Sequence, residues 1–532
     1  MMRRAIASRG RTSRLVSSAL TTTSSSFSSS STADVVIVGG GVAGAALACA
    51  LKAKPETSAL RVVVVDANDA RSDADALLGR GGKTTDGGPP DARCVALTPR
   101  SRGFLERECG DAWGAIASSG RARAFESMQV WDGVGGGHVG YDASEVGAKS
   151  LGHVVENKVV LAALEDKFAS LGVERVGQSK VEALSLPDED SPGSPARVTI
   201  ADATTGENAR GSDGKASTST TGRGREIEAR LVVAADGPKS ATRKMAGVTV
   251  GGWGYGQRAV VGTVKTEEAH STAWQRFLPT GPIALLPIGD GTWSNVVWTT
   301  TPSEAQRLTE VSDEEFAREV QDALQGYGEY KSPYQEDLNR FAALRFAEDA
   351  VNQTVKPLAR VARSTLHRAV GIPPIEPTDE DFTLDYAPRF RYPPDVLPAG
   401  ERAQRGSFPL STHHAMRLTS RRLALIGDAA HVVHPLGGQG LNLGLRDAEL
   451  LAQALTEARA HGQDIGSLNA LKPYARASVA ANAPMMAALD GLQKLFSTDA
   501  YPVALARSLG LAAVNAAPPV RKTITWYAMG AA

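Results

Sequence analysis

Residues 34–51 join a short strand to a helix through a glycine-rich turn, and few folds accommodate such a junction. The segment reads DVVIVGGGVAGAALACAL, a β-branched run followed by a helix of small residues. Gly39, Gly41 and Gly44 form the pattern G-x-G-x-x-G at the junction. The first glycine serves the tight turn, the second the close approach of a pyrophosphate, and the third the helix–strand contact. The segment predicts a Rossmann-type unit that binds a dinucleotide.

The following residues indicate one dinucleotide site rather than two. A second expected strand, 61–65, ends at Asp66, where an acid can bind a ribose 2′-hydroxyl. Another G-x-G-x-x-G occurs at Gly135, Gly137 and Gly140, but it leads into polar residues instead of an apolar helix. We interpret that copy as the flexible tip of a hairpin. The chain therefore shows one dinucleotide-binding fold and no second Rossmann unit in its sequence pattern.

Residues 423–447, LALIGDAAHVVHPLGGQGLNLGLRD, form a second junction of strand, turn and helix. An apolar strand runs into Gly427 and Asp428, and a loop from Pro435 to Gly440 leads to a helix expected to begin near Leu441. The loop glycines allow backbone N–H groups to approach a ligand, and the start of a helix favours an electron-rich group. Asp428 is placed to accept hydrogen bonds from ligand hydroxyls. A tight corner that needs glycines for geometry alone is the alternative.

Composition excludes several classes of function. The chain has 532 residues and equal numbers of basic and acidic side chains, 58 of each, so it lacks the charge of a nucleic-acid-binding protein. Cys49, Cys94 and Cys109 have neither the spacing of a disulfide framework nor that of zinc ligands. His431 and His434 lie three residues apart without nearby cysteine or carboxylate ligands, so we expect no metal.

The two ends of the chain differ in composition from the middle. Residues 1–33 contain five arginines, many Ser and Thr, and no acid, which is typical of an organelle transit peptide. The early arginines favour a mitochondrion over a plastid, and a disordered cytosolic tail is the alternative. The apolar tail from Tyr501 carries Arg507 and Arg521, with Trp526 near its end. This tail could lie in a membrane interface or pack against the protein's own core.

The second glycine-rich junction resembles a flavin-binding motif of the aromatic-ring hydroxylases, the flavoprotein monooxygenases related to p-hydroxybenzoate hydroxylase. The family pattern is GD, two small residues, His, and then P-x-x-G-Q-G-x-N. The matching positions are Gly427, Asp428, Ala429, Ala430, His431, Pro435, Gly438, Gln439, Gly440 and Asn442. The resemblance implies FAD, with the acid on the ribityl chain and the loop and helix start, including Leu441, facing the flavin ring.

Three further positions match the same family. Arg93 corresponds to an arginine near the flavin, although an ordinary surface arginine is the alternative. Glu156 and Asn157 resemble the start of the family's E-N-x-x-L signature beside the FAD, with Val160 at the leucine position, and Asn157 would also serve as a helix N-cap. Asp236 begins the pattern D-G-x-x-S-x-x-R, which ends at Arg243 and orders the dinucleotide loop. A plain N-cap is the alternative for Asp236 as well.

Within the family, residues 275–287 and 408–410 resemble the ubiquinone-biosynthesis branch, most strongly its mitochondrial carbon-five ring hydroxylases. These are sheet residues that packing alone could explain. The resemblance implies hydroxylation of a polyprenylated benzoate or phenol by dioxygen through a flavin hydroperoxide. It also implies electrons from ferredoxin and its reductase or from NAD(P)H, and a coenzyme Q biosynthetic complex as partner. The implied location is the matrix side of the mitochondrial inner membrane, with peripheral attachment.

Other functions on the same fold stay open at this point. One is a soluble aromatic hydroxylase, another an isoprenoid-acting epoxidase or reductase, and a third a catalytically silent subunit of a quinone-biosynthesis assembly. The expected fold is α/β (α+β overall), a Rossmann-type FAD-binding domain with an inserted antiparallel β-sheet substrate domain and a C-terminal helical region. The expected division is 1–33 leader, 34–112 FAD-binding, 113–150 substrate strands, 151–250 FAD-binding with a disordered insertion at about 202–226, 251–414 substrate sheet, 415–460 FAD-binding and 461–532 helical.

Overall fold

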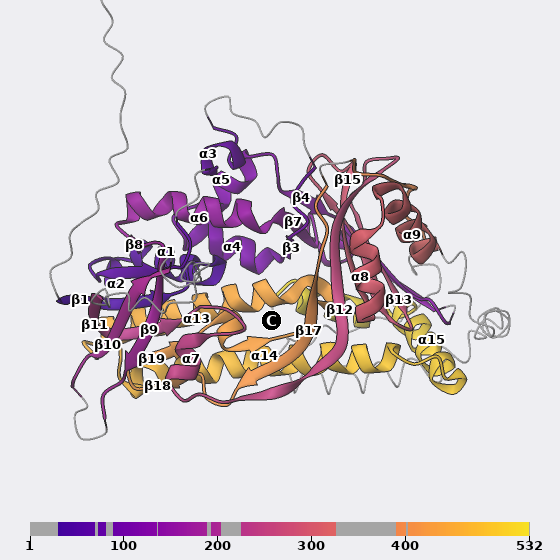
Figure 1. Cartoon of the computed structure of the whole chain (residues 1–532). Coiled ribbons are helices and arrows are strands. Elements are labelled where there is room, and N and C mark those ends of the chain that lie inside the picture. Colours follow the sequence, from indigo (N-terminus) through magenta and orange to yellow (C-terminus); the bar gives the residue numbers. More distant parts are fainter. Residues whose placement is uncertain are drawn as a thin grey trace, which may run out of the picture.

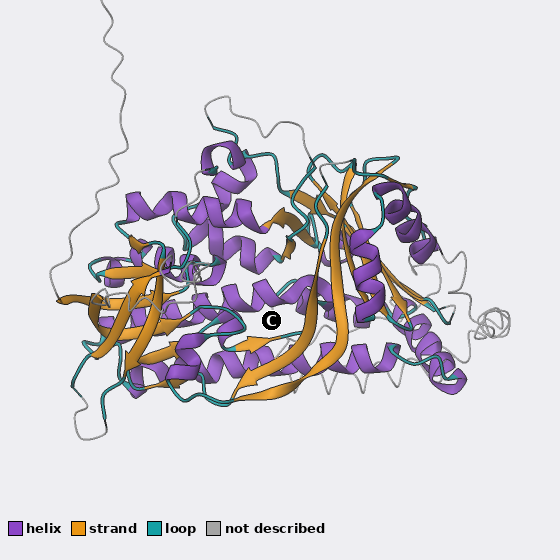
Figure 2. Cartoon of the chain, viewed as in Figure 1, coloured by secondary structure: helices purple, strands orange, loops and turns teal. Residues whose placement is uncertain are grey.

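The computed structural model describes residues 30–69, 73–80, 89–135, 137–188, 193–203, 225–325, 390–400 and 403–530. Most of the expected leader and most of the insertion at about 202–226 lie outside these ranges, so both stay predictions. Residues 30–33, assigned above to the leader, belong to the first strand. The described chain is a mixed α/β fold, which confirms the expected fold class (Figure 2).

A mainly parallel sheet forms one end of the molecule (Figure 1). Its parallel neighbours, in spatial order, are β19 (Leu423–Leu425), β11 (Arg225–Ala234), β1 (Ser30–Val38), β2 (Val62–Val65) and β8 (Glu174–Val176). Antiparallel strands extend it at β18 (Thr419–Ser420), β10 (Ala196–Asp202) and β9 (Ser179–Ser185). The valines of β2 are buried on both faces, as the strand of a covered parallel sheet requires.

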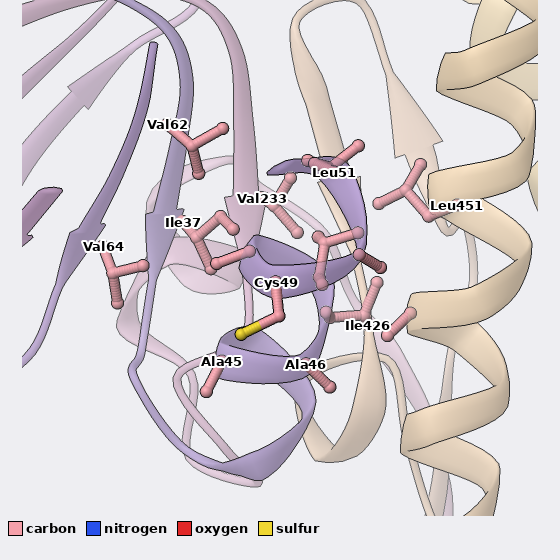
Figure 3. Close-up of a cluster of buried hydrophobic side chains, with 14 of the residues drawn as sticks. Ile37, Ala45, Ala46, Cys49, Leu51, Val62, Val64, Val233, Ile426 and Leu451 are labelled. Carbon is pink, nitrogen blue, oxygen red and sulfur yellow. The ribbon is translucent and has the colours of Figure 1, made fainter. Parts of the chain in front are cut away.

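Helix α1 (Val42–Ala53) lies between this sheet and α13 (Gln439–Ala460), as Figure 3 shows. Its small side chains, such as Ala45 and Ala46, are fully buried and allow the helix to approach the sheet closely. Cys49 is also fully buried there, and burial raises the pKa of its thiol to about 12. The thiol is therefore a packing group rather than a reactive one.

A larger, mainly antiparallel sheet forms the other end of the molecule (Figure 1). Its strands in spatial order are β20 (His431–Val432), β17 (Gly406–Ala415), β12 (Val250–Thr266), β15 (Trp293–Thr300), β14 (Gly281–Ile288), β13 (Thr272–Leu278), β5 (Ser127–Asp132) and β6 (His138–Asp142), with β16 (Val396–Leu397) on β12. The long strands β12 and β17 run from this sheet toward the parallel one. This sheet is the antiparallel β-sheet that the sequence analysis expected beside the Rossmann-type domain.

A small sheet and several short helices connect the two ends. The small sheet consists of β3 (Cys94–Leu97), β7 (Gly152–Glu156) and β4 (Arg123–Phe125). The helices are α2 (Pro55–Ser58), α3 (Ala74–Leu77), α4 (Pro99–Arg107), α5 (Ala112–Ser118), α6 (Asn157–Leu171), α7 (Ala241–Met245), α8 (Pro302–Glu310) and α9 (Asp313–Gln325), with 3-10 turns η1 (Ala143–Val146), η6 (Gly427–Ala429) and η7 (Leu436–Gly438). The domain boundaries given above stay a proposal.

The C-terminal helices α14 (Leu468–Phe496), α15 (Tyr501–Asn515) and α16 (Pro518–Ala528) pack along the molecule. β5 and β6 form the expected hairpin, and α15 packs against it. The flexibility of its tip stays a prediction, since Gly136 lies outside the described residues. A Cβ added to Gly135 would lie 1.9 Å from Ser508 Oγ. Beside this contact, buried Arg507 donates to both carboxylate oxygens of Asp132 at 2.5 and 3.0 Å.

The tail therefore packs against the protein's own core, which was one of the two possibilities left open above. Arg507 and Arg521 are buried in ion pairs with Asp132 and Glu145, so neither presents its charge to a headgroup. Among the described residues, no single helix has the length and hydropathy to cross a membrane. One pair of helices, Pro502–Asn515 and Pro518–Ala528, meets those criteria jointly but bends by 93° at its break.

The buried Asp132–Arg507 pair generates a prediction about stability. Arg507→Met should destabilise the fold by about 3–5 kcal/mol, because it leaves the Asp132 carboxylate buried without its cation. Asp132→Leu combined with Arg507→Met should recover much of that loss. Urea unfolding curves measure the difference. The control Lys494→Met removes an exposed pair with Asp490 and should cost less than about 1 kcal/mol; an equally small loss for Arg507→Met would contradict the prediction.

Candidate active site

Four adjacent parallel strands bring the predicted cofactor residues to one edge of the sheet. Asp66 follows β2, Gly39 follows β1, Asp236 lies two residues beyond β11, and Gly427 lies two residues beyond β19. The spatial order β19-β11-β1-β2 makes these strand ends neighbours. The carboxyl edge of an open α/β sheet is where such folds bind ligands.

The first glycine turn has the geometry that its sequence predicts. Gly39 adopts φ +105°, and a Cβ there would lie 2.3 Å from the carbonyl oxygen of Ala235. A Cβ on Gly44 would lie 2.1 Å from the carbonyl oxygen of Gly39, so helix and strand meet at van der Waals distance. A Cβ on Gly41 would meet no protein atom within 4 Å. The protein itself thus requires glycine at the outer two positions, and Gly41 faces open space suited to a ligand.

The two acids at this edge hold backbone turns. Asp66 accepts hydrogen bonds from the backbone N–H of Gly40 at 2.5 Å and of Asn68 at 2.7 Å. Asp236 accepts from the backbone N–H of Thr242 and from the Ser240 hydroxyl, so its carboxylate holds the first turn of α7. The N-cap of α7 is Ser240, so the plain N-cap alternative for Asp236 was wrong. A direct contact between Asp236 and the cofactor stays a prediction.

Asp447, a residue that the motif reading did not select, holds the second glycine turn. Its fully buried carboxylate accepts from the Gly427 backbone N–H at 2.9 Å, His431 Nε2 at 2.6 Å and the Ser478 hydroxyl at 2.7 Å. Asn482 donates to the same carboxylate at 3.1 Å. Asp447 thereby fastens the turn to α13 and α14 and leaves the neighbouring Asp428 side chain exposed at the sheet edge.

The electrostatics of this turn follow from its surroundings. Burial lowers the pKa of His431, but the ion pair and hydrogen bond with Asp447 outweigh burial and raise it above the ordinary value. The Asp428 side chain is open to solvent, yet the protein around it excludes enough water to raise its pKa, against a smaller lowering by His431. Burial lowers the pKa of His434 to about 4, so His434 is neutral and its Nδ1 accepts from the Leu436 N–H.

The glycine loop after this turn lines a cavity of about 550 Å³. Five of the predicted site residues lie on its wall: Arg93, Asn157, Pro435, Gly438 and Gln439. The expected helix start near Leu441 was two residues late, because α13 begins at Gln439 with Gly438 as its N-cap at φ +63°. Gly440 and Leu441 therefore lie in the first helical turn, whose N–H groups have no partner within the helix.

Two asparagines near the loop have different roles. Asn157 is the first residue of α6 rather than its N-cap, which is Glu156, so the capping alternative was wrong. Its Oδ1 is buried and has no hydrogen-bond partner among the described residues. Asn442 instead accepts from the Thr98 N–H at 3.0 Å and donates to the Ala96 carbonyl at 2.9 Å. Asn442 therefore fixes β3 against the loop, and a direct cofactor contact stays a prediction.

The remaining cavity walls come from the antiparallel sheet and the C-terminal helices. Strands β5, β6 and β12–β15 supply one wall. Helices α14, α15 and α16 supply the other through residues that the sequence analysis did not select: Met485, Leu489, Phe496, Leu511, Tyr527 and Met529. The signal available in the sequence was the apolar composition of the tail, which does not reveal what the tail packs against.

These features fit FAD. The open space beside Gly41 would accommodate a pyrophosphate, and Asp66 and Asp428 would accept from ribose and ribityl hydroxyls. The buried Asn157 Oδ1, which has no partner among the described residues, would accept from a bound group. The helix start at Gln439 presents N–H groups to the electron-rich edge of a ring. Bound FAD would supply the chemistry of oxygen activation, which no side chain provides.

Comparisons with known proteins agree with this geometry. A family profile described as "FAD binding domain" matches residues 118–351 and 359–478. Among solved structures, p-nitrophenol 4-monooxygenase PnpA from Pseudomonas putida DLL-E4 has TM-score 0.59 and 18% identity, covering 93% of this chain and 97% of that one. At this identity the likeness concerns the fold. The fold, the site and the family profile together define an FAD-binding flavoprotein.

Two curated relatives indicate the particular family to which this chain belongs. The mitochondrial ubiquinone biosynthesis monooxygenase COQ6 of Xenopus tropicalis is 33% identical over 494 residues, 92% of this chain and 91% of the relative. The human protein of the same name is 32% identical over 445 residues, 82% of this chain and 81% of the relative. The chain belongs to the COQ6 family of ubiquinone biosynthesis monooxygenases.

Gly41 provides a test of the cofactor site. In Gly41→Ala the new methyl group meets no protein atom within 4 Å, so the fold should be unchanged, whereas FAD should bind at least about tenfold more weakly. The absorption spectrum of the purified protein and the FAD released on denaturation measure occupancy. Gly510→Ala, which also meets no protein atom within 4 Å, should retain full occupancy. Equal FAD content in both variants would refute a pyrophosphate at Gly41.

The His431–Asp447 pair predicts a pH dependence of stability. Because the pKa of His431 is raised in the folded state, the pair stabilises fully below the ordinary histidine pKa of about 6.5 and loses its contribution as pH rises through the folded pKa. The difference in unfolding free energy between wild type and His431→Gln should therefore be larger at about pH 6 than at about pH 9. Urea unfolding across that range measures it, and a difference that grows with pH would contradict the assignment.

Proposed function

We propose that this FAD-dependent monooxygenase hydroxylates the aromatic ring of a polyprenylated phenol or benzoate in ubiquinone biosynthesis. The observation that carries the proposal is a cavity that begins at the glycine loop and continues between apolar walls. A flat ring fits beside the loop, and an isoprenoid chain suits the apolar walls. Membership of a family of ubiquinone biosynthesis monooxygenases supports the same substrate class.

The protein's own contribution to this reaction is positioning and exclusion of water. Apolar residues of the sheet and of α14–α16 surround the space next to the loop, which protects reactive oxygen chemistry from water. The N–H groups at the start of α13 and in the loop stabilise negative charge that develops on a bound ring. Dioxygen and a reductant are required; we propose ferredoxin with its reductase, or NAD(P)H, as the electron source.

We further propose that the enzyme binds the matrix face of the mitochondrial inner membrane within a coenzyme Q biosynthetic complex. Phe408 and Leu492 both line the cavity and are exposed at the surface, 43% and 40%, so the cavity opens beside them. Leu495, 41% exposed, lies one helical turn from Leu492 on α14. A prenylated substrate could then enter directly from the bilayer.

A comparison of lipidic and soluble phenols tests the proposed function. FAD-loaded enzyme with a ferredoxin system or NAD(P)H should hydroxylate a farnesylated 4-hydroxybenzoate presented in anionic vesicles, detected as a mass increase of one oxygen. Turnover of soluble phenols alone would overturn the proposal. Leu492→Asp should reduce vesicle-dependent turnover, because burying a carboxylate at a lipid surface is costly. Leu468→Asp, at the opposite end of α14 and also exposed, is the matched control.

A further inference from the structure

One row of residues crosses the cavity face of the antiparallel sheet, and a single member of this row is polar. The pairing registers Val130–Val139, Gln275–Val130, Gln275–Ala284, Ala284–Val297 and Val261–Val297 join six strands side by side. All six residues line the cavity. From β6 to β12 the row reads Val139, Val130, Gln275, Ala284, Val297 and Val261.

Gln275 is thus an amide in an apolar setting. Two positions along β13 in either direction, Ala273 and Phe277 also line the cavity. The Gln275 side chain is only 8% exposed, and within the described ranges it makes no hydrogen bond to the protein. Its amide atoms are open to the cavity rather than sealed inside the protein, so an occupant of the cavity, ligand or water, is what can pair with them. A leucine or methionine at this position would need no such partner.

We propose that Gln275 is the residue that recognises the polar substituent, a hydroxyl or carboxylate, on the ring of the substrate. This assignment rests on the proposed function, because it takes the cavity occupant to be a prenylated ring. The amide both donates and accepts, so it matches a phenol or a benzoate, and the surrounding apolar residues hold the rest of the molecule. A site built to hydrogen-bond one substituent discriminates strongly against analogues that lack it.

Measuring the binding of two ligands distinguishes recognition of the polar substituent by Gln275 from simple packing of its side chain. The probes are farnesylated 4-hydroxybenzoate and farnesylbenzene, which lacks the polar substituents; both are titrated into the FAD-loaded enzyme and followed by perturbation of the flavin spectrum. Gln275→Leu should weaken binding of the benzoate about tenfold, the loss of roughly one hydrogen bond, and leave farnesylbenzene unchanged. Gln275→Glu keeps the side-chain shape and should reject the benzoate more strongly through charge repulsion.

Gln129 offers a matched control on the neighbouring strand. It is 5% exposed, its Oε1 has no hydrogen-bond partner among the described residues, and it is not part of the cavity wall. Gln129→Leu should leave binding of both ligands unchanged. Equal effects of Gln275→Leu on the two ligands, or no effect on either, would overturn the assignment. Failure of the wild-type enzyme to bind either prenylated probe would overturn the proposed function and this assignment with it.

Discussion

The whole site depends on the close contact of two glycine junctions that are far apart in the sequence. A Cβ on Gly427 would lie 3.3 Å from the Ala43 Cβ, and one on Gly444 would lie 3.3 Å from the Gly427 Cα. Small residues on α1 and α13 therefore let the turn after β19 approach the turn after β1. Larger side chains would separate the helices and with them the two halves of the cofactor cradle. Asp447 completes the arrangement, because a buried carboxylate fixes the second turn where packing has placed it.

The parts of the fold that were predictable are those in which neighbouring residues determine the geometry. Gly39 and Gly44 could be assigned because a strand, a tight turn and a helix restrict one another over a few positions. The same holds for the loop at Pro435–Gly440, apart from the helix start, which lies at Gln439 rather than near Leu441. The role of Asp236 was more ambiguous, because an acid that holds the start of a helix and an acid that binds a ligand look identical in sequence. In the structure Asp236 accepts from the Thr242 N–H.

The parts that could not be predicted depend on contacts between distant segments. Asp132 and Arg507 are 375 positions apart, and no sequence pattern around either residue predicts their ion pair. The tail was therefore compatible with a membrane interface until its arginines were located in the core. Gln275 is a similar case. Its side chain lies on the cavity face of the sheet only in the observed strand register, and a shift of β13 by one residue would turn it to the opposite face. The residues next to Gln275 in the sequence resemble the ubiquinone-biosynthesis branch of the family, but they do not predict which face of the sheet its side chain occupies.

The position of the cavity wall in the chain has a consequence for how the enzyme matures. The glycine turns, Asp66 and Asp428 all precede α14, whereas Arg507 and the helices α15 and α16 follow it in the chain and are synthesised later. The cofactor cradle can therefore assemble while the chamber for the second reactant is still open along one side. A chain that ends before α15 would hold every residue of the cradle and yet lack a closed chamber. Binding of the cofactor and closure of the chamber therefore depend on different segments of the chain, of which the closing segment is made later.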